Sequence, residues 1–170
     1  VTNDFQKCIN ADGLVIPGVG AFAACMEGLL KHRADAIVDA RMTKNLQTLG
    51  ICVGAQTLFS FGDEHDVVTP GLGQWNGTVT KLQDPKLPHM GWNTIDSQAP
   101  SLLVEASQLH KSAYFAHSYF CPVVPSTTFT CEYGSVFSAV VEHNNVFGVQ
   151  FHPEKSAQFG VGVIQKFVGL

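Results

Sequence analysis

The chain has 170 residues, of which 45% are hydrophobic and 14% are charged. This length suits one domain with a sizeable core, and the composition excludes a disordered chain, so we expect a single domain over residues 1–170. The net charge is −4 and the basic residues are scattered, which excludes the basic surface that nucleic acids and anionic membranes select. The expected partners are small molecules or proteins, with no nucleic acid and no membrane.

The cysteines indicate a reducing compartment. They form no C-x-x-C pair, their odd number leaves one unpaired in any disulfide scheme, and none has a metal-ligand spacing with histidine. Free thiols persist in the cytosol. No apolar stretch reaches the roughly 18 residues of a membrane span, and no signal peptide is recognisable. We therefore expect a cytoplasmic protein without a metal site. The cysteines are Cys8, Cys25, Cys52, Cys121 and Cys131.

The first sixty residues predict strands alternating with helices. Residues 12–20 (DGLVIPGVG) are a short apolar run stopped by proline and glycine, which predicts a buried strand and a tight loop. From 21 to 41 apolar residues recur at helical spacing with one break near His32, predicting two helices or one bent helix. A second strand is expected over 45–51 and a helix over 53–61. This order is typical of a parallel sheet covered by helices.

The remainder of the chain predicts mostly strands. Residues 66–83 alternate apolar and polar positions between turn formers, as a half-exposed hairpin does. The last helix is expected over about 157–168. The predicted fold is therefore α/β, with one mixed sheet flanked by helices. Further strands are predicted within 113–120, 127–134, 138–144 and 146–152.

One cysteine stands between two glycines where a strand gives way to a helix. The sequence G-I-C-V-G at 50–54 has the form of a nucleophile elbow, which exposes Cys52 at the carboxyl end of a strand. The positive end of a helix beginning near Val53 favours the thiolate. The competing interpretation is a buried structural cysteine, and without the flanking glycines it is the better one.

A base and an oxyanion site are also recognisable. GVQFHPEKS places His152 and Glu154 two residues apart after a strand, so an acid can orient the imidazole that accepts the thiol proton. The N–H of Val53 is one candidate oxyanion donor, and the PGVG loop at 17–20 offers a second. Alone, these features fit a solvated H-x-E pair and an ordinary turn. Together they predict amide or ester cleavage through a thioester.

Five motifs resemble one family. PGVGAF, GICVGAQ, PHMGWN, YFAHSY and GVQFHPEKS occur in the order seen in class I (triad type) glutamine amidotransferases, and more narrowly in the glutaminase subunits of imidazole glycerol phosphate synthase. The resemblance implies a flavodoxin-like α/β fold whose mixed central sheet is largely parallel, with additional antiparallel strands. The family begins with a further strand and helix, and the resemblance predicts a domain that lacks them before Val1.

The resemblance also implies roles for individual residues. Cys52 is implied as the nucleophile, His152 as the general acid/base and Glu154 as its orienting partner, and no cofactor is implied. The oxyanion residues are expected to be Gly18, Val19, Gly20 and Val53. The substrate-binding residues are expected to be Gly20, Gln56, Glu64, His117, Ser118 and Tyr119.

A protein partner is implied as well. In the family, ammonia passes through a channel to a (β/α)8-barrel cyclase in a heterodimer that serves histidine biosynthesis. Trp92, Tyr114 and Lys155 match the surface that meets the cyclase, and exposed aromatic residues are common at interfaces. The alternatives are a cysteine hydrolase, an amidotransferase serving another synthase, and a non-catalytic interaction protein on the same scaffold.

Overall fold

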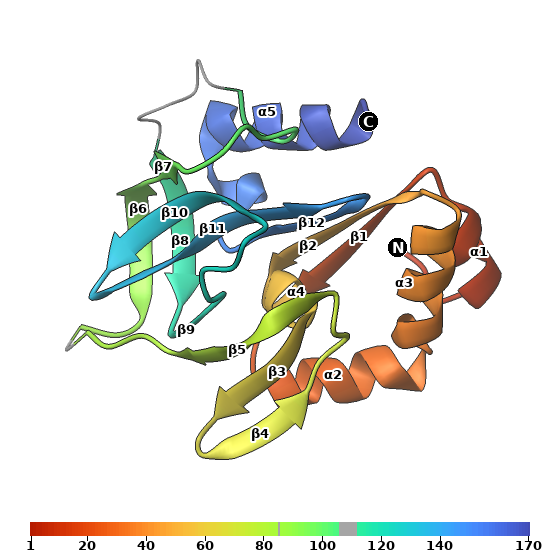
Figure 1. Cartoon of the computed structure of the whole chain (residues 1–170), viewed down its shortest axis with the longest axis horizontal. Coiled ribbons are helices and arrows are strands. Elements are labelled where there is room, and N and C mark those ends of the chain that lie inside the picture. Colours follow the sequence, from red (N-terminus) through yellow and green to blue (C-terminus); the bar gives the residue numbers. More distant parts are fainter. Residues whose placement is uncertain (85, 106–111) are drawn as a thin grey trace.

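A six-stranded mixed sheet forms the centre of the fold (Figure 1). The structure is a computed structural model that describes residues 1–84, 86–105 and 112–170. Strands β1, β2 and β12 run parallel to one another, and the remaining pairings are antiparallel. The adjacent parallel strands β2 and β12 therefore end at one edge of the sheet. In sheet order the strands are β1 (Gly13–Gly18), β2 (Gln47–Cys52), β12 (Val146–Val149), β11 (Ser135–His143), β10 (Thr127–Tyr133) and β7 (Asp96–Ser97).

Helix α5 (Ala157–Val168) covers one face of this sheet (Figure 1). Its buried residues Phe159, Val163 and Phe167 recur every four positions and so form one apolar stripe. The stripe joins a core cluster that includes Leu49 of β2 and Phe147 of β12. This packing anchors the segment between β12 and α5, the 3-10 turn η2 (Pro153–Lys155), which follows His152.

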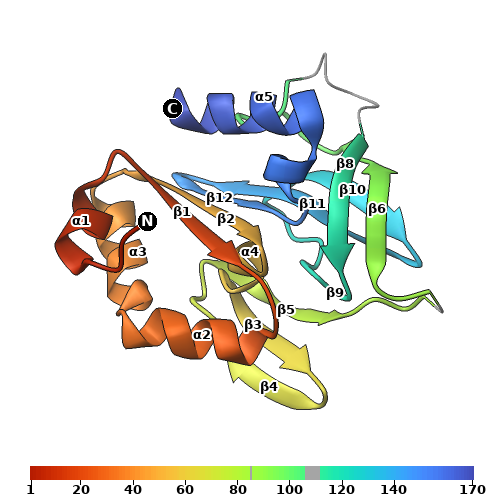
Figure 2. The ribbon, with the colours of Figure 1, turned by 180° about the vertical axis from the view of Figure 1, so that it is seen from behind.

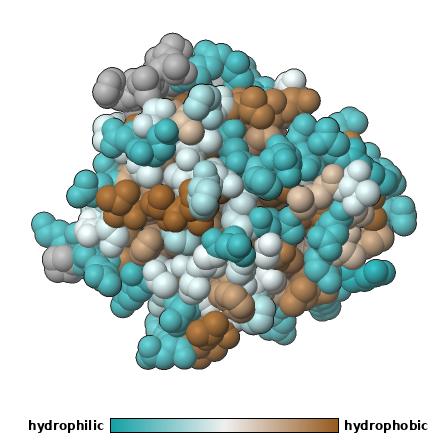
Figure 3. Space-filling model, in the orientation of Figure 1, coloured by the Kyte–Doolittle hydropathy of each residue, from teal (hydrophilic) through white to brown (hydrophobic). Residues whose placement is uncertain are grey.

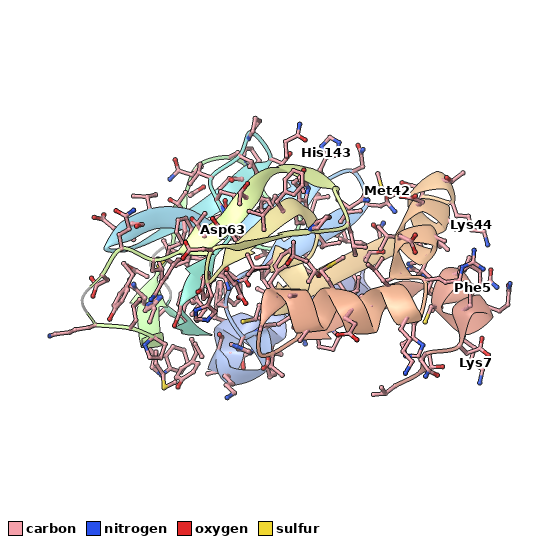
Figure 4. All side chains as sticks on the ribbon, turned by 90° about the horizontal axis from the view of Figure 1, so that it is seen from below. Phe5, Lys7, Met42, Lys44, Asp63 and His143 are labelled. Carbon is pink, nitrogen blue, oxygen red and sulfur yellow. The ribbon has the colours of Figure 1, made fainter. Side chains whose placement is uncertain are left out.

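The other helices lie away from α5 (Figure 2). They are α1 (Phe5–Asn10), α2 (Phe22–Lys31), α3 (Ala34–Thr43) and the single turn α4 (Val53–Gln56). Helix α1 packs on α3, and Lys44 Nζ donates to Asn10 Oδ1 over 2.8 Å; Phe5 and Lys44 lie at the same end of the molecule in Figure 4. Within the described residues, no helix has the length and apolar character needed to cross a membrane.

A second sheet corrects two predictions. Its order is β4 (Val67–Pro70), β3 (Phe59–Glu64), β5 (Trp75–Lys81) and β9 (Tyr119–Phe120). The helix predicted over 53–61 is wrong beyond Gln56, because most of the second half of that segment belongs to β3. The hairpin predicted over 66–83 is also wrong, because β3 lies between β4 and β5. The segment between β4 and β5 is held by backbone hydrogen bonds from the N–H of Gly71 to the carbonyl of Ser60 and from the N–H of Leu72 to the carbonyl of Thr57.

A two-stranded sheet completes the fold. It pairs β6 (His89–Thr94) with β8 (Ser112–His117) in antiparallel register. The strand β6 was not predicted, because PHMGWN has few β-branched residues. The helices expected over 21–41, the strands at 12–20 and 45–51, and the last helix are confirmed. The burial predicted for the strand at 12–20 is wrong, because β1 lies at the edge of the sheet and only its Ile16 is buried. The α/β class with a mixed central sheet and additional antiparallel strands is confirmed too.

The buried guanidinium of Arg41 holds α1, α3 and β2 together. It is fully buried, and its nitrogens donate to the carbonyl oxygens of Cys8, Ala11 and Gln47 and to Thr48 Oγ1 over 2.6–3.1 Å. We expect Arg41→Met to lower the free energy of unfolding by about 3 kcal/mol, because buried acceptors lose a charged donor. Urea unfolding followed by circular dichroism measures this change.

The matched control is the exposed Lys31 on α2. Lys31→Met should change the free energy of unfolding by less than about 0.5 kcal/mol. Equal effects from the two substitutions would contradict the assignment of Arg41 as a structural tie.

Candidate active site

Cys52 occupies a strained turn between β2 and α4. Its backbone has φ 54° and ψ −117°, a conformation that L-residues rarely adopt. The glycines on either side permit the turn. A Cβ on Gly50 would lie 2.6 Å from Ala55 Cα, and a Cβ on Gly54 would lie 1.9 Å from the carbonyl oxygen of Ile16. The structure therefore has the elbow geometry that G-I-C-V-G predicts.

Burial makes this thiol hard to ionise. Cys52 is 3% exposed, and burial raises the pKa of its thiol to about 11, although a hydrogen bond from the Val53 N–H acts in the opposite direction. The sequence predicted a thiolate favoured by the helix after Cys52. That helix has only four residues, and burial outweighs it. Ionisation at neutral pH thus requires help from neighbouring side chains.

His152 is placed to accept a proton. Its Nδ1 lies 2.8 Å from Glu154 Oε1. Because a carboxylate only accepts, Nδ1 carries a hydrogen, and Nε2 is therefore the nitrogen that acts as acceptor in the neutral form of the ring. His152 is buried, whereas the Glu154 side chain is 56% exposed, so this hydrogen bond lies at the boundary between the protein interior and solvent. The backbone of His152 is fixed by a bond from its N–H to the carbonyl of Tyr114 and by one from Ser156 Oγ to its own carbonyl.

A single cavity of about 380 Å³ joins the two groups. Cys52 ends β2, His152 follows β12 by three residues, and both line the cavity, while Glu154 bonds to the imidazole. All the predicted substrate-binding residues line the same cavity, as do Val19 and Val53, but Gly18 does not. The lining residues that the sequence did not predict are Ala21, His65, Pro88, Met90 and Ala116.

The glycine loop borders the cavity next to the sulfur. Val19 is 79% exposed, and its carbonyl accepts from Cys25 Sγ over 3.3 Å. Gly20 follows with φ +90°, a value that suits glycine. Gly18 lies beneath the elbow, where a Cβ would come within 2.3 Å of Gly54 N. The structure thus places Val19 and Gly20 at the cavity and gives Gly18 a packing position.

Two predicted substrate residues are already held by protein groups. Glu64 Oε2 accepts from the N–H of Phe22 at the start of α2 over 2.9 Å. Gln56 Nε2 donates to the carbonyl of Tyr119 over 2.7 Å and to Gln150 Oε1 over 3.1 Å. Both side chains therefore have fixed orientations at the cavity wall.

A buried pair of histidines supports the far wall. His89 Nδ1 lies 3.1 Å from His117 Nε2, and His117 Nδ1 lies 2.9 Å from the carbonyl of Tyr119. Burial lowers the pKa of His89 to about 4 and that of His117 to about 3. Both rings are therefore neutral at pH 7. Because a carbonyl only accepts, His117 donates from Nδ1, accepts at Nε2, and His89 donates to it.

The three predicted interface residues form one cluster. The rings of Trp92 and Tyr114 meet edge to face with centroids 5.9 Å apart, and Lys155 Nζ lies 5.8 Å from the Tyr114 ring centroid. Trp92 is 55% exposed, and Met90 on the same face of β6 is also exposed. Met90 lines the cavity as well. Met90, Trp92 and Tyr114 form a largely apolar surface with the positive charge of Lys155 beside it, and this surface reaches the cavity rim.

Val67 and Val68 of β4 are exposed apolar residues outside that surface. In Figure 3 brown patches alternate with teal ones, and one brown patch lies at the bottom near the β3–β4 hairpin, where Val67 and Val68 are exposed.

All five cysteines have free thiols. Among the described residues, no group of three or more His, Cys, Asp or Glu side chains is placed to hold a metal ion.

The sequence matches one family over nearly its whole length. Residues 1–168 match the family described as "Glutamine amidotransferase class-I". The chain belongs to this family. As a class-I glutamine amidotransferase it is an enzyme that uses the amide nitrogen of glutamine, and the amidotransferase resemblance drawn from the five motifs is confirmed.

Two relatives of this amidotransferase carry the same description. It is 44% identical over 179 residues to "Imidazole glycerol phosphate synthase subunit HisH" of Streptomyces coelicolor, covering 99% of this chain and 80% of that protein. It is 44% identical over 172 residues to the protein of the same name from Mycobacterium bovis, covering 99% and 84%. The solved "Crystal structure of glutamine amidotransferase" matches with TM-score 0.72 at 15% identity, covering 99% and 85%, and supports the fold.

Proposed function

We propose that this chain is the glutaminase subunit of an imidazole glycerol phosphate synthase, which releases ammonia from glutamine for a cyclase subunit in histidine biosynthesis. The observation that carries the proposal is the shared cavity of Cys52 and His152, whose imidazole is oriented by Glu154. The similarity to HisH subunits over 99% of the chain supports the choice of synthase. The five free thiols fit a cytoplasmic protein.

Acylation begins with proton transfer from sulfur to nitrogen. His152 Nε2 takes the proton of Cys52, and the sulfur attacks the side-chain carbonyl carbon of glutamine. The N–H of Val53 and an N–H of the loop at Val19 and Gly20 donate hydrogen bonds to the carbonyl oxygen and stabilise the negative charge that develops on it. His152 then gives the proton to the amide nitrogen as the carbon–nitrogen bond breaks, leaving ammonia and a γ-glutamyl thioester.

Hydrolysis of the thioester returns the enzyme to its starting state. His152 takes a proton from water as the oxygen attacks the thioester carbon. The carbon–sulfur bond then breaks to give glutamate, and His152 returns its proton to the sulfur of Cys52. Glu64 lines the same cavity, and a carboxylate there can pair with the α-ammonium group of the substrate. This contact would select an amino acid rather than a simple amide.

The surface of Met90, Trp92, Tyr114 and Lys155 is proposed to meet the (β/α)8-barrel cyclase. Aromatic and methionine side chains are common at the centre of such interfaces. Because this surface reaches the cavity rim, a bound cyclase would cover the exit through which ammonia leaves. Free ammonia is largely protonated in water near neutral pH, so direct transfer would preserve its nucleophilic form.

The test reconstitutes the chain with its cognate cyclase subunit. With glutamine as the nitrogen source, we expect glutamate and imidazole glycerol phosphate to form in equal amounts. Asparagine, which is one methylene shorter, is the matched control and should support neither product. An ammonium salt should restore cyclase turnover without this chain. Cyclase product from ammonium but none from glutamine in the assembled complex would contradict the proposal.

A further inference from the structure

A buried amide next to the nucleophile has an unambiguous orientation. Gln150 is 1% exposed and follows β12, two residues before His152. Its Oε1 lies 3.0 Å from the backbone nitrogen of Cys121. Because a backbone N–H only donates, the atom facing it must be the amide oxygen. The NH2 group of Gln150 therefore faces the other way, and its Nε2 lies 3.9 Å from Cys52 Sγ.

The orientation of Gln56 follows from that of Gln150. Gln56 Nε2 donates one hydrogen to Gln150 Oε1 and the other to the carbonyl of Tyr119. The same carbonyl accepts from His117 Nδ1, so it is held in place. Since both hydrogens of the Gln56 amide are used, its oxygen is the group left for the cavity that Gln56 lines. The two amides thus form one polar chain from the cavity wall to the sulfur.

We propose that Gln150 is a catalytic residue of this site: its amide N–H donates to the Cys52 sulfur and stabilises the thiolate, while its oxygen keeps Gln56 presenting an acceptor to the substrate. This inference deepens the proposed function and rests on it. A hydrogen bond to an anionic acceptor is stronger than one to a neutral acceptor. The donor therefore favours the thiolate over the thiol, and it acts together with the N–H of Val53 and the imidazole of His152.

Such a donor matters because the surroundings of Cys52 oppose ionisation. The sulfur is buried, and the burial is the main cause of its raised pKa. The carboxylate of Glu154 and the thiol of Cys25 also raise this pKa, and Cys52 in turn helps to raise the pKa of Cys121. The other titratable side chains that line the cavity are Glu64, His65, His117, Tyr119 and His152.

The test measures the reactivity of the Cys52 thiol directly. The intact chain is alkylated with iodoacetamide between pH 7 and 10, and peptide mapping by mass spectrometry gives the rate at each cysteine. Gln150→Met keeps the length of the side chain and removes the donor. Gln150→Glu keeps an acceptor for Cys121 and Gln56 but replaces the donor by a negative charge.

We expect Gln150→Met to raise the pKa of Cys52 by about one unit. This lowers the thiolate population about tenfold, but a more basic thiolate is intrinsically about threefold more reactive, so the alkylation rate should fall about three- to fourfold. Gln150→Glu should lower the rate further. The rate at Cys25 in the same sample is the internal control and should not change. Gln98→Met, which removes a bond to Thr130 outside the cavity, is the matched control for losing an amide.

The outcomes separate this inference from the proposed function. If Cys52 is alkylated at the wild-type rate in both Gln150 variants, the role of Gln150 is overturned, whatever the glutaminase activity of these variants. If Gln150→Met fails to fold, Gln150→Glu alone decides. Glutaminase activity that survives Cys52→Ala would overturn the proposed function, but it would leave the measured effect of Gln150 on the thiol intact.

Discussion

Replacing Cys52 by alanine is expected to lower the glutaminase kcat of the complex with the cyclase by a factor on the order of 10⁴ to 10⁶, as loss of the nucleophile or its base does in other triad enzymes. Covalent chemistry at the sulfur cannot be replaced by the remaining oxyanion donors. Cyclase turnover with an ammonium salt should be unchanged, because the substitution removes the source of ammonia and leaves the partner intact. Glutamate release and ammonium-dependent turnover are measured in the same preparation.

Cys131→Ala is the matched control. Cys131 is 1% exposed in β10 and lies outside the cavity, so its replacement should cost about 1 kcal/mol of stability and leave kcat unchanged. The glutamine analogue diazo-oxonorleucine should label the Cys52 peptide in this variant and in the wild type. Undiminished glutamate release by Cys52→Ala would show that another group attacks the substrate.

The elbow could be predicted because its chemistry is local. Gly50 and Gly54 flank Cys52 at positions where a Cβ would meet backbone atoms, and backbone crowding of this kind leaves glycine as the residue that fits. The strands β1 and β2 are marked by short apolar runs, although β1 lies at the edge of the sheet and buries only Ile16, and α5 is marked by an apolar stripe. In these segments the local pattern and the tertiary contacts agree, so each prediction held.

The second sheet could not be predicted because its pairing is not local. Residues 66–83 have the alternation of a hairpin, yet β5 pairs in parallel with β3. Phe59 and Trp75 face each other in this pairing, and their ring centroids lie 5.2 Å apart in the core. The alternation of apolar and polar residues predicts which side chains face inward, but it does not predict which strand is the neighbour. The strand β3 was hidden by the helical appearance of the residues after Cys52.

The network behind the site was missed for a related reason. The motif GVQFHPEKS contains Gln150, and its position after an apolar strand gave the one available signal, a polar residue among buried ones. Its partners Gln56 and Cys121 come from distant segments. His89 was likewise hidden in a motif assigned to a surface. Hydrogen bonds between segments far apart in sequence produce no recognisable motif, whereas His152 and Glu154 stand two residues apart and can be recognised as a pair.

The elbow also makes the fold and the site depend on the same contacts. Gly54 lies in α4 directly against β1, where an added Cβ would come within 1.9 Å of the carbonyl oxygen of Ile16. Because the clash is with backbone in the central sheet, no side-chain movement relieves it. The strained turn at Cys52 and the pairing of β1 with β2 therefore both depend on the close contact between Gly54 and the backbone of Ile16.

Gly54→Ala is accordingly expected to destabilise the protein by about 4 kcal/mol or more, a large part of the stability of an ordinary domain. Urea unfolding followed by circular dichroism measures the effect. The matched control is Gly28→Ala in α2, where an added Cβ meets nothing within 4 Å. Alanine favours helix there, so this variant should be more stable than the wild type by about 0.5–1 kcal/mol. A Gly54→Ala protein that unfolds at the wild-type urea concentration would mean that β1 and α4 can separate without cost, and that the turn at Cys52 is held by other contacts.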